Sequence, residues 1–155
     1  MSVELPFAPI EWSNDMATGL PEIDKQHRYL VDTLHEANWR LLHDGEGARL
    51  SEIAHDLLNY AIMHFEAEEA LMRRYGYEAA CHVLARAHVA QHRDFSHKVV
   101  VILDQLREGK PVSRIEVLKF LNEWLRHHVL GVDQVLARFV LAAAGQACDD
   151  DVPRS

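Results

Sequence analysis

Residues that interrupt helices are scarce in this sequence. Among 155 residues there are 7 glycines and 5 prolines, so few positions force a long helix to end, and the turn-rich pattern of a β-sheet protein is missing. No apolar run approaches the roughly 18 residues needed to cross a membrane. The first residues also lack the basic and apolar segments of a signal peptide. We therefore expect a cytoplasmic, helical protein without a membrane span.

Cysteine and positive charge are also scarce. The two cysteines, Cys81 and Cys148, are expected to be free thiols, since nothing in the sequence indicates export to an oxidising compartment. Lysine and arginine number 16 against 24 aspartates and glutamates, for a net charge of −8 with histidine neutral. This balance argues against a nucleic-acid partner, because binding to a phosphate backbone requires a clustered basic surface.

Histidine, by contrast, is abundant. The chain has 11 histidines, while its 48% apolar and 26% charged residues are ordinary for a globular protein. Its length is that of one domain with a hydrophobic core of its own. Because histidine is the commonest metal ligand and also titrates near neutral pH, its positions decide what the excess means.

Four segments carry apolar residues at three- and four-residue steps, the spacing of an amphipathic helix. The predicted helices span residues 21–43, 49–75, 79–108 and 113–145. Ser113 and Glu116 form a capping-box pattern at the start of the fourth. Short connections force neighbouring helices to run antiparallel, so we expect an all-α fold, an up-down-up-down antiparallel four-helix bundle.

The bundle is expected to form a single domain, residues 1–145. Residues 1–20 contain Trp12 but no strong periodicity and are predicted to be an N-terminal arm. Residues 146–155, with three consecutive aspartates, are predicted to be a disordered acidic tail. A monomer or a weak oligomer is expected, and the sequence indicates no protein partner.

Polar residues interrupt the apolar stripe of every predicted helix. They are His27 in the first, His64 and Glu68 in the second, His88 and His92 in the third, and His128 and Asp133 in the fourth. Burying one unpaired polar group costs about 1–3 kcal/mol, and an unpaired carboxylate costs more. A shared metal site would satisfy all seven groups together.

The joint arrangement carries this prediction, because the separate pairs are not distinctive. His64/Glu68 and His88/His92 have the spacing that places both members on one helix face. A chain of this composition, however, is expected to contain about one pair of each kind by chance. His128 and Asp133 are five residues apart, about 140° around an ideal helix. A π-bulge or a position on either side of one inter-helix seam would bring them together.

The same residues lie in motifs that resemble the hemerythrins, specifically the bacterial single-domain type. The resemblance runs from about Trp12 to about Val140. It includes residues 23–27 (IDKQH), 64–69 (HFEAEE), 88–95 (HVAQHRDF) and 124–129 (WLRHHV), followed by Asp133. The ordered set of five histidines, one glutamate and one aspartate is the specific part of the match.

The resemblance implies a non-haem centre of two iron ions with an oxo or hydroxo bridge. By this resemblance His88, His92 and His128 bind one iron, His27 and His64 bind the other, and Glu68 and Asp133 bridge both. These ligands and the bridge would leave one coordination position open, on the iron with two histidines. O2 would be the ligand that binds there.

The expected function is reversible O2 binding, in a carrier, storage or delivery protein and not an enzyme. Ferritin-like di-iron enzymes use two Glu-x-x-His motifs, whereas this chain has a single one, Glu52/His55. Three alternatives stay open: a regulatory domain that senses O2, redox state or iron; a di-iron oxidase, peroxidase or nitric-oxide reductase; and a zinc site in the same ligands.

Apolar neighbours of the predicted ligands are expected to enclose a dry pocket, which would exclude larger substrates. They are Leu30, Phe65, Leu84, Phe95, Trp124 and Leu125. The other histidines are expected on solvated faces or at helix ends: His35, His43, His55, His82, His97 and His127.

Overall fold

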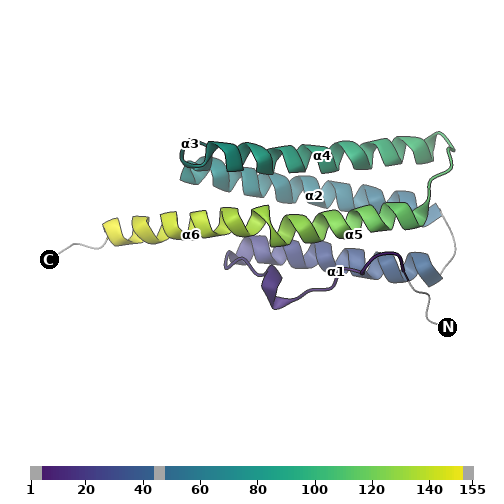
Figure 1. Ribbon diagram of the computed structural model, residues 1–155, viewed down its shortest axis with the longest axis horizontal. Helices are drawn as coiled ribbons and strands as arrows, with labels where there is room; N and C mark the ends of the chain where they lie inside the picture. The colour runs from purple at the N-terminus through teal and green to yellow at the C-terminus, as the bar shows by residue number, and fades with distance from the viewer. Residues whose placement is uncertain (1–4, 44–47, 152–155) are drawn as a thin grey trace.

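The computed structural model describes residues 5–43 and 48–151, and the side chains of 5–40 and 50–145. Four rods run side by side along the long axis of the molecule (Figure 1). The rods are α1 (Pro21–His43), α2 (Ala48–Tyr75), α4 (His82–Arg107) and the successive pair α5 (Arg114–Leu130) and α6 (Val132–Asp151). The remaining elements are the 3-10 turn η1 (Asn14–Met16) and the one-turn helix α3 (Tyr77–Ala80). The described residues contain no strand.

Each rod contacts the next one along the chain, and α5 closes the ring against α1. Apolar side chains from all four rods fill the interior, with Leu34, Leu58 and Leu121 among them. One helix, α5, begins where the sequence places a capping box. The hydroxyl of Ser113 accepts a hydrogen bond from the backbone N–H of Glu116 at the start of α5. The expected all-α four-helix bundle is therefore present.

The N-terminal arm packs onto the bundle. Phe7 and Ile10 are buried in the core, and the backbone N–H of Ile10 donates to Oδ1 of Asn122 at 2.8 Å. Asn122 exchanges two further hydrogen bonds with Asn38, at 2.7 and 2.8 Å. This buried amide pair satisfies its own polar groups and attaches the arm to the seam between α1 and α5.

Two helix breaks depart from the sequence prediction. The predicted third helix starts later, at His82, because Gly76 (φ +68°) ends α2 and the short α3 stops at Cys81. The predicted fourth helix is not continuous but is interrupted at Gly131, between α5 and α6. The described residues contain no π-helix, so this interruption, and not a π-bulge, separates His128 from Asp133.

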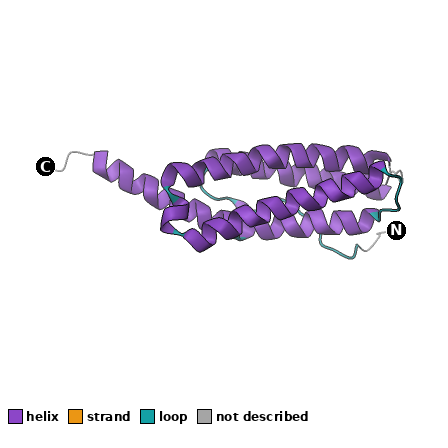
Figure 2. Ribbon diagram, turned by 90° about the horizontal axis from the view of Figure 1, so that it is seen from above, coloured by secondary structure: helices purple, strands orange, loops and turns teal. Residues whose placement is uncertain are grey.

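The C-terminal helix is longer than expected. Its backbone continues to Asp151, past the predicted end near Gly145, and projects beyond the end of the bundle (Figure 2). The first part of the predicted acidic tail is therefore helical, and residues 152–155 lie outside the described part of the chain. Residues 44–47, in the predicted connection between the first two helices, and the side chains of His43 and Cys148 also lie outside it.

One stretch, Arg114–Gly145, is apolar and long enough to cross a membrane by length and composition alone. A single candidate of this kind is weak evidence, because core helices of soluble proteins pass the same test. Here the stretch contains the break at Gly131 and supplies two buried polar side chains, His128 and Asp133, to the interior.

Candidate metal centre

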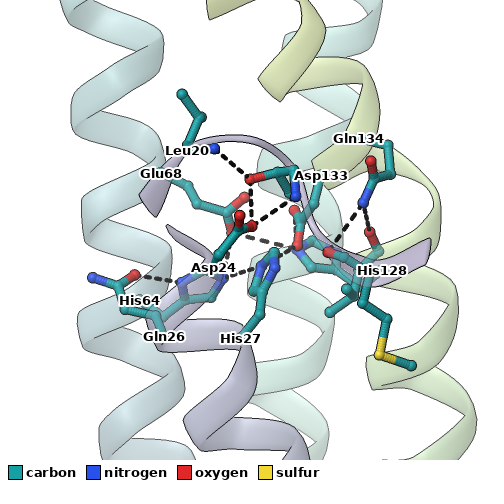
Figure 3. A network of polar contacts seen from close by, with 12 residues as sticks. Leu20, Asp24, Gln26, His27, His64, Glu68, His128, Asp133 and Gln134 are labelled. Atoms are coloured by element: carbon teal, nitrogen blue, oxygen red, sulfur yellow. Dashed lines mark hydrogen bonds and ion pairs between the residues drawn. The ribbon is translucent and has the colours of Figure 1, made fainter. Parts of the chain in front are cut away.

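All seven side chains that interrupt the apolar stripes converge in the interior of the bundle. Each is at most 3% exposed. Figure 3 shows His27, His64, Glu68, His128 and Asp133 pointing toward one another from α1, α2, α5 and α6. His88 and His92 reach the same region from α4, where their imidazoles approach the two carboxylates.

The seven form two overlapping groups that could each hold a metal ion, with ligand atoms within 4.8 Å of one another. One group joins three histidines to the two carboxylates: His88, His92, His128, Glu68 and Asp133. The other joins two histidines to the same carboxylates: His27, His64, Glu68 and Asp133. We call these the three-histidine group and the two-histidine group. Both carboxylates belong to both groups, as bridging ligands must.

Short distances join the groups through the carboxylate oxygens. In the two-histidine group, Nε2 of His27 lies 2.8 Å from Oδ2 of Asp133, and Nε2 of His64 lies 2.9 Å from Oε1 of Glu68. In the three-histidine group, Nε2 of both His88 and His128 lies 3.0 Å from Oδ1 of Asp133. Nε2 of His92 lies 3.3 Å from Oε1 of Glu68, so Nε2 of each of the five histidines faces a carboxylate.

The polar atoms at this centre are close together but poorly matched as hydrogen-bond partners. Despite the short distances, all four oxygens of Glu68 and Asp133 lack a partner with hydrogen-bond geometry, as do Nε2 of His88, His92 and His128. So many unpartnered buried atoms are rare in folded proteins. Imidazole nitrogens with carboxylate oxygens are ligands of transition metals, so the residues present fit a metal pair.

Electrostatics of the centre point the same way. Burial and the repulsion from Glu68 would both raise the pKa of Asp133. The contacts with His128 and His27 outweigh these two effects and lower the pKa to about 2. Histidine contacts likewise hold the pKa of Glu68 well below its usual range against burial. Burial would lower the pKa of His128, yet Asp133 and Glu68 raise it to about 9. Imidazolium charge therefore offsets carboxylate charge, a role that bound cations would take over.

The break at Gly131 explains the five-residue gap between His128 and Asp133. His128 stands in the last turn of α5, and Asp133 in the first turn of α6. The Gly131 carbonyl accepts from the backbone N–H of Gln134, and the Gln134 side chain donates to the carbonyls of Val129 and Met16, each at 3.2 Å. The junction is thus tied to both helices and to the N-terminal arm.

Three polar residues outside the predicted set hold the outer nitrogens of the histidines. The Gln26 amide oxygen contacts Nδ1 of His64 at 2.6 Å, and that of Gln91 contacts Nδ1 of His128 at 2.9 Å. A Glu69 carboxylate oxygen lies 3.3 Å from Nδ1 of His92. Such partners fix the ring orientation and raise the basicity of a ligating histidine.

Sequence reasoning missed these three residues, although a signal for them exists. Each is the immediate neighbour of a predicted ligand: Gln26 precedes His27, Gln91 precedes His92, and Glu69 follows Glu68. One step along a helix turns a side chain by about 100°, away from the centre and toward the adjacent helix. A polar residue next to a ligand is therefore placed to hold a histidine on another helix.

Aromatic rings pack against the histidines on one side of the centre. The Phe65 ring stacks on His92 with centroids 4.0 Å apart, and the Trp124 ring stacks on His128 at 4.4 Å. Beside them lies an apolar cavity of about 20 Å³. Its walls are Leu30, Leu34, Leu57, Ala61, His64, Phe65, Phe95, Leu121, Trp124, Leu125 and His128.

The prediction of Leu84 as a wall of this pocket was wrong. Leu84 is 46% exposed, while Ala85 is buried in its place. The buried stripe of α4 follows Ala85, His88 and His92 in steps of three and four, so Leu84 lies one position off the inner face. The other predicted pocket residues do line the cavity. The predicted surface histidines with described side chains (His35, His55, His82, His97 and His127) are exposed.

A four-helix bundle that encloses two overlapping groups of histidine and carboxylate side chains defines a metal-binding helical protein. The family model described as "Hemerythrin HHE cation binding domain" matches residues 18–140. The chain therefore belongs to the hemerythrin family, and the resemblance seen in the sequence is confirmed.

Relatives agree with this assignment, and a solved structure agrees with the fold. A bacteriohemerythrin of Pseudomonas paraeruginosa is 32% identical over 131 residues, which cover 82% of this chain and 78% of the relative. A bacteriohemerythrin of Stenotrophomonas maltophilia is 30% identical over 143 residues, covering 90% and 87%. The crystal structure of a wild-type hemerythrin superposes with a TM-score of 0.71 at 24% identity, over 86% of this chain and 98% of that one. The helical bundle predicted from the sequence is confirmed.

Metal addition is expected to stabilise the protein. The unpartnered carboxylate and imidazole atoms would become ligands of the metal, and the unfolded chain does not hold these atoms together. With free Fe(II) at about 1,000 times its Kd, the gain is roughly 4 kcal/mol, which for a chain of this size raises Tm by on the order of 10 °C. Thermal melts of protein stripped with a chelator and then reloaded measure the shift. An unchanged Tm would show that the centre holds no metal.

Proposed function

We propose that this chain binds O2 reversibly at a non-haem di-iron centre and serves as an oxygen carrier, store or delivery protein, without a catalytic role. The observation that carries the proposal is the pairing of two features. Two metal-ligand groups share both of their carboxylates, and an apolar cavity with room for one small molecule lies against a histidine of each group.

The two groups offer unequal numbers of protein ligands. The three-histidine group has five residues and the two-histidine group has four. For two metals of equal coordination number, the metal in the two-histidine group keeps one more position for a ligand that is not protein. When bound, the iron pair would supply two electrons that O2 takes up on binding and returns on release. The protein would hold both metals through the residues of the two groups.

The cavity favours a small ligand over an organic substrate. A volume of about 20 Å³ exceeds the roughly 10–15 Å³ that one water molecule requires, and it leaves no room for a larger molecule. Its walls are apolar apart from His64 and His128. Leu30, Leu125 and the Trp124 ring would exclude water and so slow the loss of a reduced form of oxygen to solvent.

The test is an oxygenation experiment on metal-quantified protein. Anaerobic protein loaded with Fe(II) is expected to develop a visible absorption band when O2 is admitted and to lose the band under vacuum, over repeated cycles. The expected stoichiometry is one O2 per two irons. Protein that binds zinc in preference to iron, or that consumes O2 continuously with a reductant, would contradict the proposal.

A further inference from the structure

One carboxylate outside the two metal-ligand groups contacts a histidine inside them. Oε2 of Glu69 lies 3.3 Å from Nδ1 of His92. The opposite ring nitrogen of His92, Nε2, lies 3.3 Å from Oε1 of Glu68. The His92 imidazole therefore stands between two carboxylates, one in the centre and one outside it, and the face of Phe65 packs against its ring.

The other histidines of the centre have neutral outer partners or none. Nδ1 of His64 and of His128 contacts a glutamine amide oxygen, and Nδ1 of His27 and of His88 has no hydrogen-bond partner. Among the side chains that the structure describes, Glu69 is thus the single charged group in contact with the outer nitrogen of any of the five. The extra negative charge falls on the three-histidine group, which also has the larger number of protein ligands.

A carboxylate that accepts a hydrogen bond from the outer N–H of a histidine raises the basicity of that histidine as a ligand. A more basic ligand stabilises the higher positive charge of an oxidised metal more than the lower charge of a reduced one. We propose that Glu69 is a positioning residue that orients His92 and lowers the reduction potential of the metal in the three-histidine group. This inference rests on the proposed function, because it concerns the same metal pair.

The location of Glu69 makes the inference testable. Its side chain is 31% exposed and lines an open groove between α2 and α4, beside Arg73 and Arg93. A substitution there leaves no cavity in the core, so Glu69→Gln removes the charge with little change in shape. Glu66, three residues earlier on α2, is exposed and belongs to neither metal-ligand group. Glu66→Gln therefore removes the same charge nearby without touching a ligand.

The experiment compares wild type, Glu69→Gln, Glu69→Asp and Glu66→Gln. Spectroelectrochemical titration of the iron-loaded proteins measures the reduction potential, and competition with a chelator measures Fe(II) and Co(II) affinity. We expect Glu69→Gln to shift the potential to a more positive value and to weaken metal binding about 10-fold. Glu69→Asp keeps the charge and should lie closer to wild type than Glu69→Gln. Glu66→Gln should match wild type in both measurements.

The outcomes separate the two proposals. If wild type holds two irons but Glu69→Gln and Glu66→Gln have the same potential and affinity, the role of Glu69 is wrong and the proposed function stands. If wild type holds neither Fe(II) nor Co(II), both proposals are wrong. Thermal melts of the metal-free variants detect a folding defect. If Glu69→Gln is poorly folded, Glu69→Asp decides the question. This variant keeps the negative charge, so a raised reduction potential together with wild-type metal affinity would contradict the proposed effect of that charge.

Discussion

Replacing Glu68 by alanine is expected to reduce the metal content from two ions per chain to nearly none. Glu68 is one of the two carboxylates shared by both metal-ligand groups, and its oxygens lie within 3.6 Å of Nε2 of His64, His88, His92 and His128. Its loss removes a ligand from each metal and the negative charge that offsets them. Elemental analysis after anaerobic loading with Fe(II) and desalting measures the result.

Stability measurements show whether this loss reflects the site or the fold. In the metal-free protein Glu68 is a buried carboxylate whose oxygens lack hydrogen-bond partners. It nevertheless faces the imidazolium of His128, and removing one partner of a buried charge pair costs about 3–5 kcal/mol because the other charge is left uncompensated. Metal-free Glu68→Ala should therefore still unfold cooperatively, but at a lower denaturant concentration than metal-free wild type, and only wild type should gain stability on adding Fe(II). Two irons retained in Glu68→Ala would contradict the ligand assignment.

Matched variants on α1 and α2 sharpen the comparison. Glu66→Ala removes a carboxylate from the exposed side of α2 and should keep both metals. His27 belongs to the two-histidine group alone, so His27→Ala should keep the metal of the three-histidine group and lose the other. A graded series of two, one and nearly no ions per chain would follow from two groups that share their carboxylates. A single metal site would lose its ion in one step.

Helical periodicity allowed the buried polar residues to be found from the sequence. His88 and His92 were predicted to face the core because Phe95, Val99 and Ile102 continue the same stripe, and all five are buried. Seven polar residues in apolar stripes then required a common partner, since isolated burial is unfavourable. This reasoning needs only the phase of each helix, which long regular segments define well.

Periodicity does not predict how a helix ends or what lies one step off its inner face. Leu84 was predicted to line the pocket, but Ala85 takes the buried position beside it. Gln26, Gln91 and Glu69 were missed for a related reason. Their partners lie on other helices, and only the packing of two helices places an amide or carboxylate beside a particular imidazole.

The break between α5 and α6 was also not predicted. The spacing of His128 and Asp133 indicated an irregularity in the helix but not its kind. A glycine alone did not distinguish a bend from a continuous helix, because isolated glycines are tolerated in helices at a cost of about 1 kcal/mol. The structure identifies the requirement. A Cβ atom added to Gly131 would lie 2.6 Å from the backbone carbonyl oxygen of His127, a distance that ordinary packing does not permit.

Replacing Gly131 by alanine is accordingly expected to damage the metal centre without touching a ligand. To relieve the contact with His127, the chain must move at the junction, and any movement displaces His128 on one side or Asp133 on the other. Because Asp133 belongs to both groups, both metals should bind more weakly, by about 10–100-fold. The free energy of unfolding of the metal-free protein should fall by about 1–3 kcal/mol.

Gly145→Ala is the matched control, because a Cβ atom at that position of α6 meets nothing within 4 Å. The same substitution there should leave metal affinity unchanged and stabilise the helix by up to about 1 kcal/mol. Chelator competition and denaturant unfolding of both variants give the comparison. Wild-type affinity in Gly131→Ala would show that the junction can accept a side chain and that the five-residue gap needs another explanation. If Gly131→Ala loses affinity and Gly145→Ala does not, the helix break is a structural requirement of the centre, because the break sets the distance between His128 and Asp133.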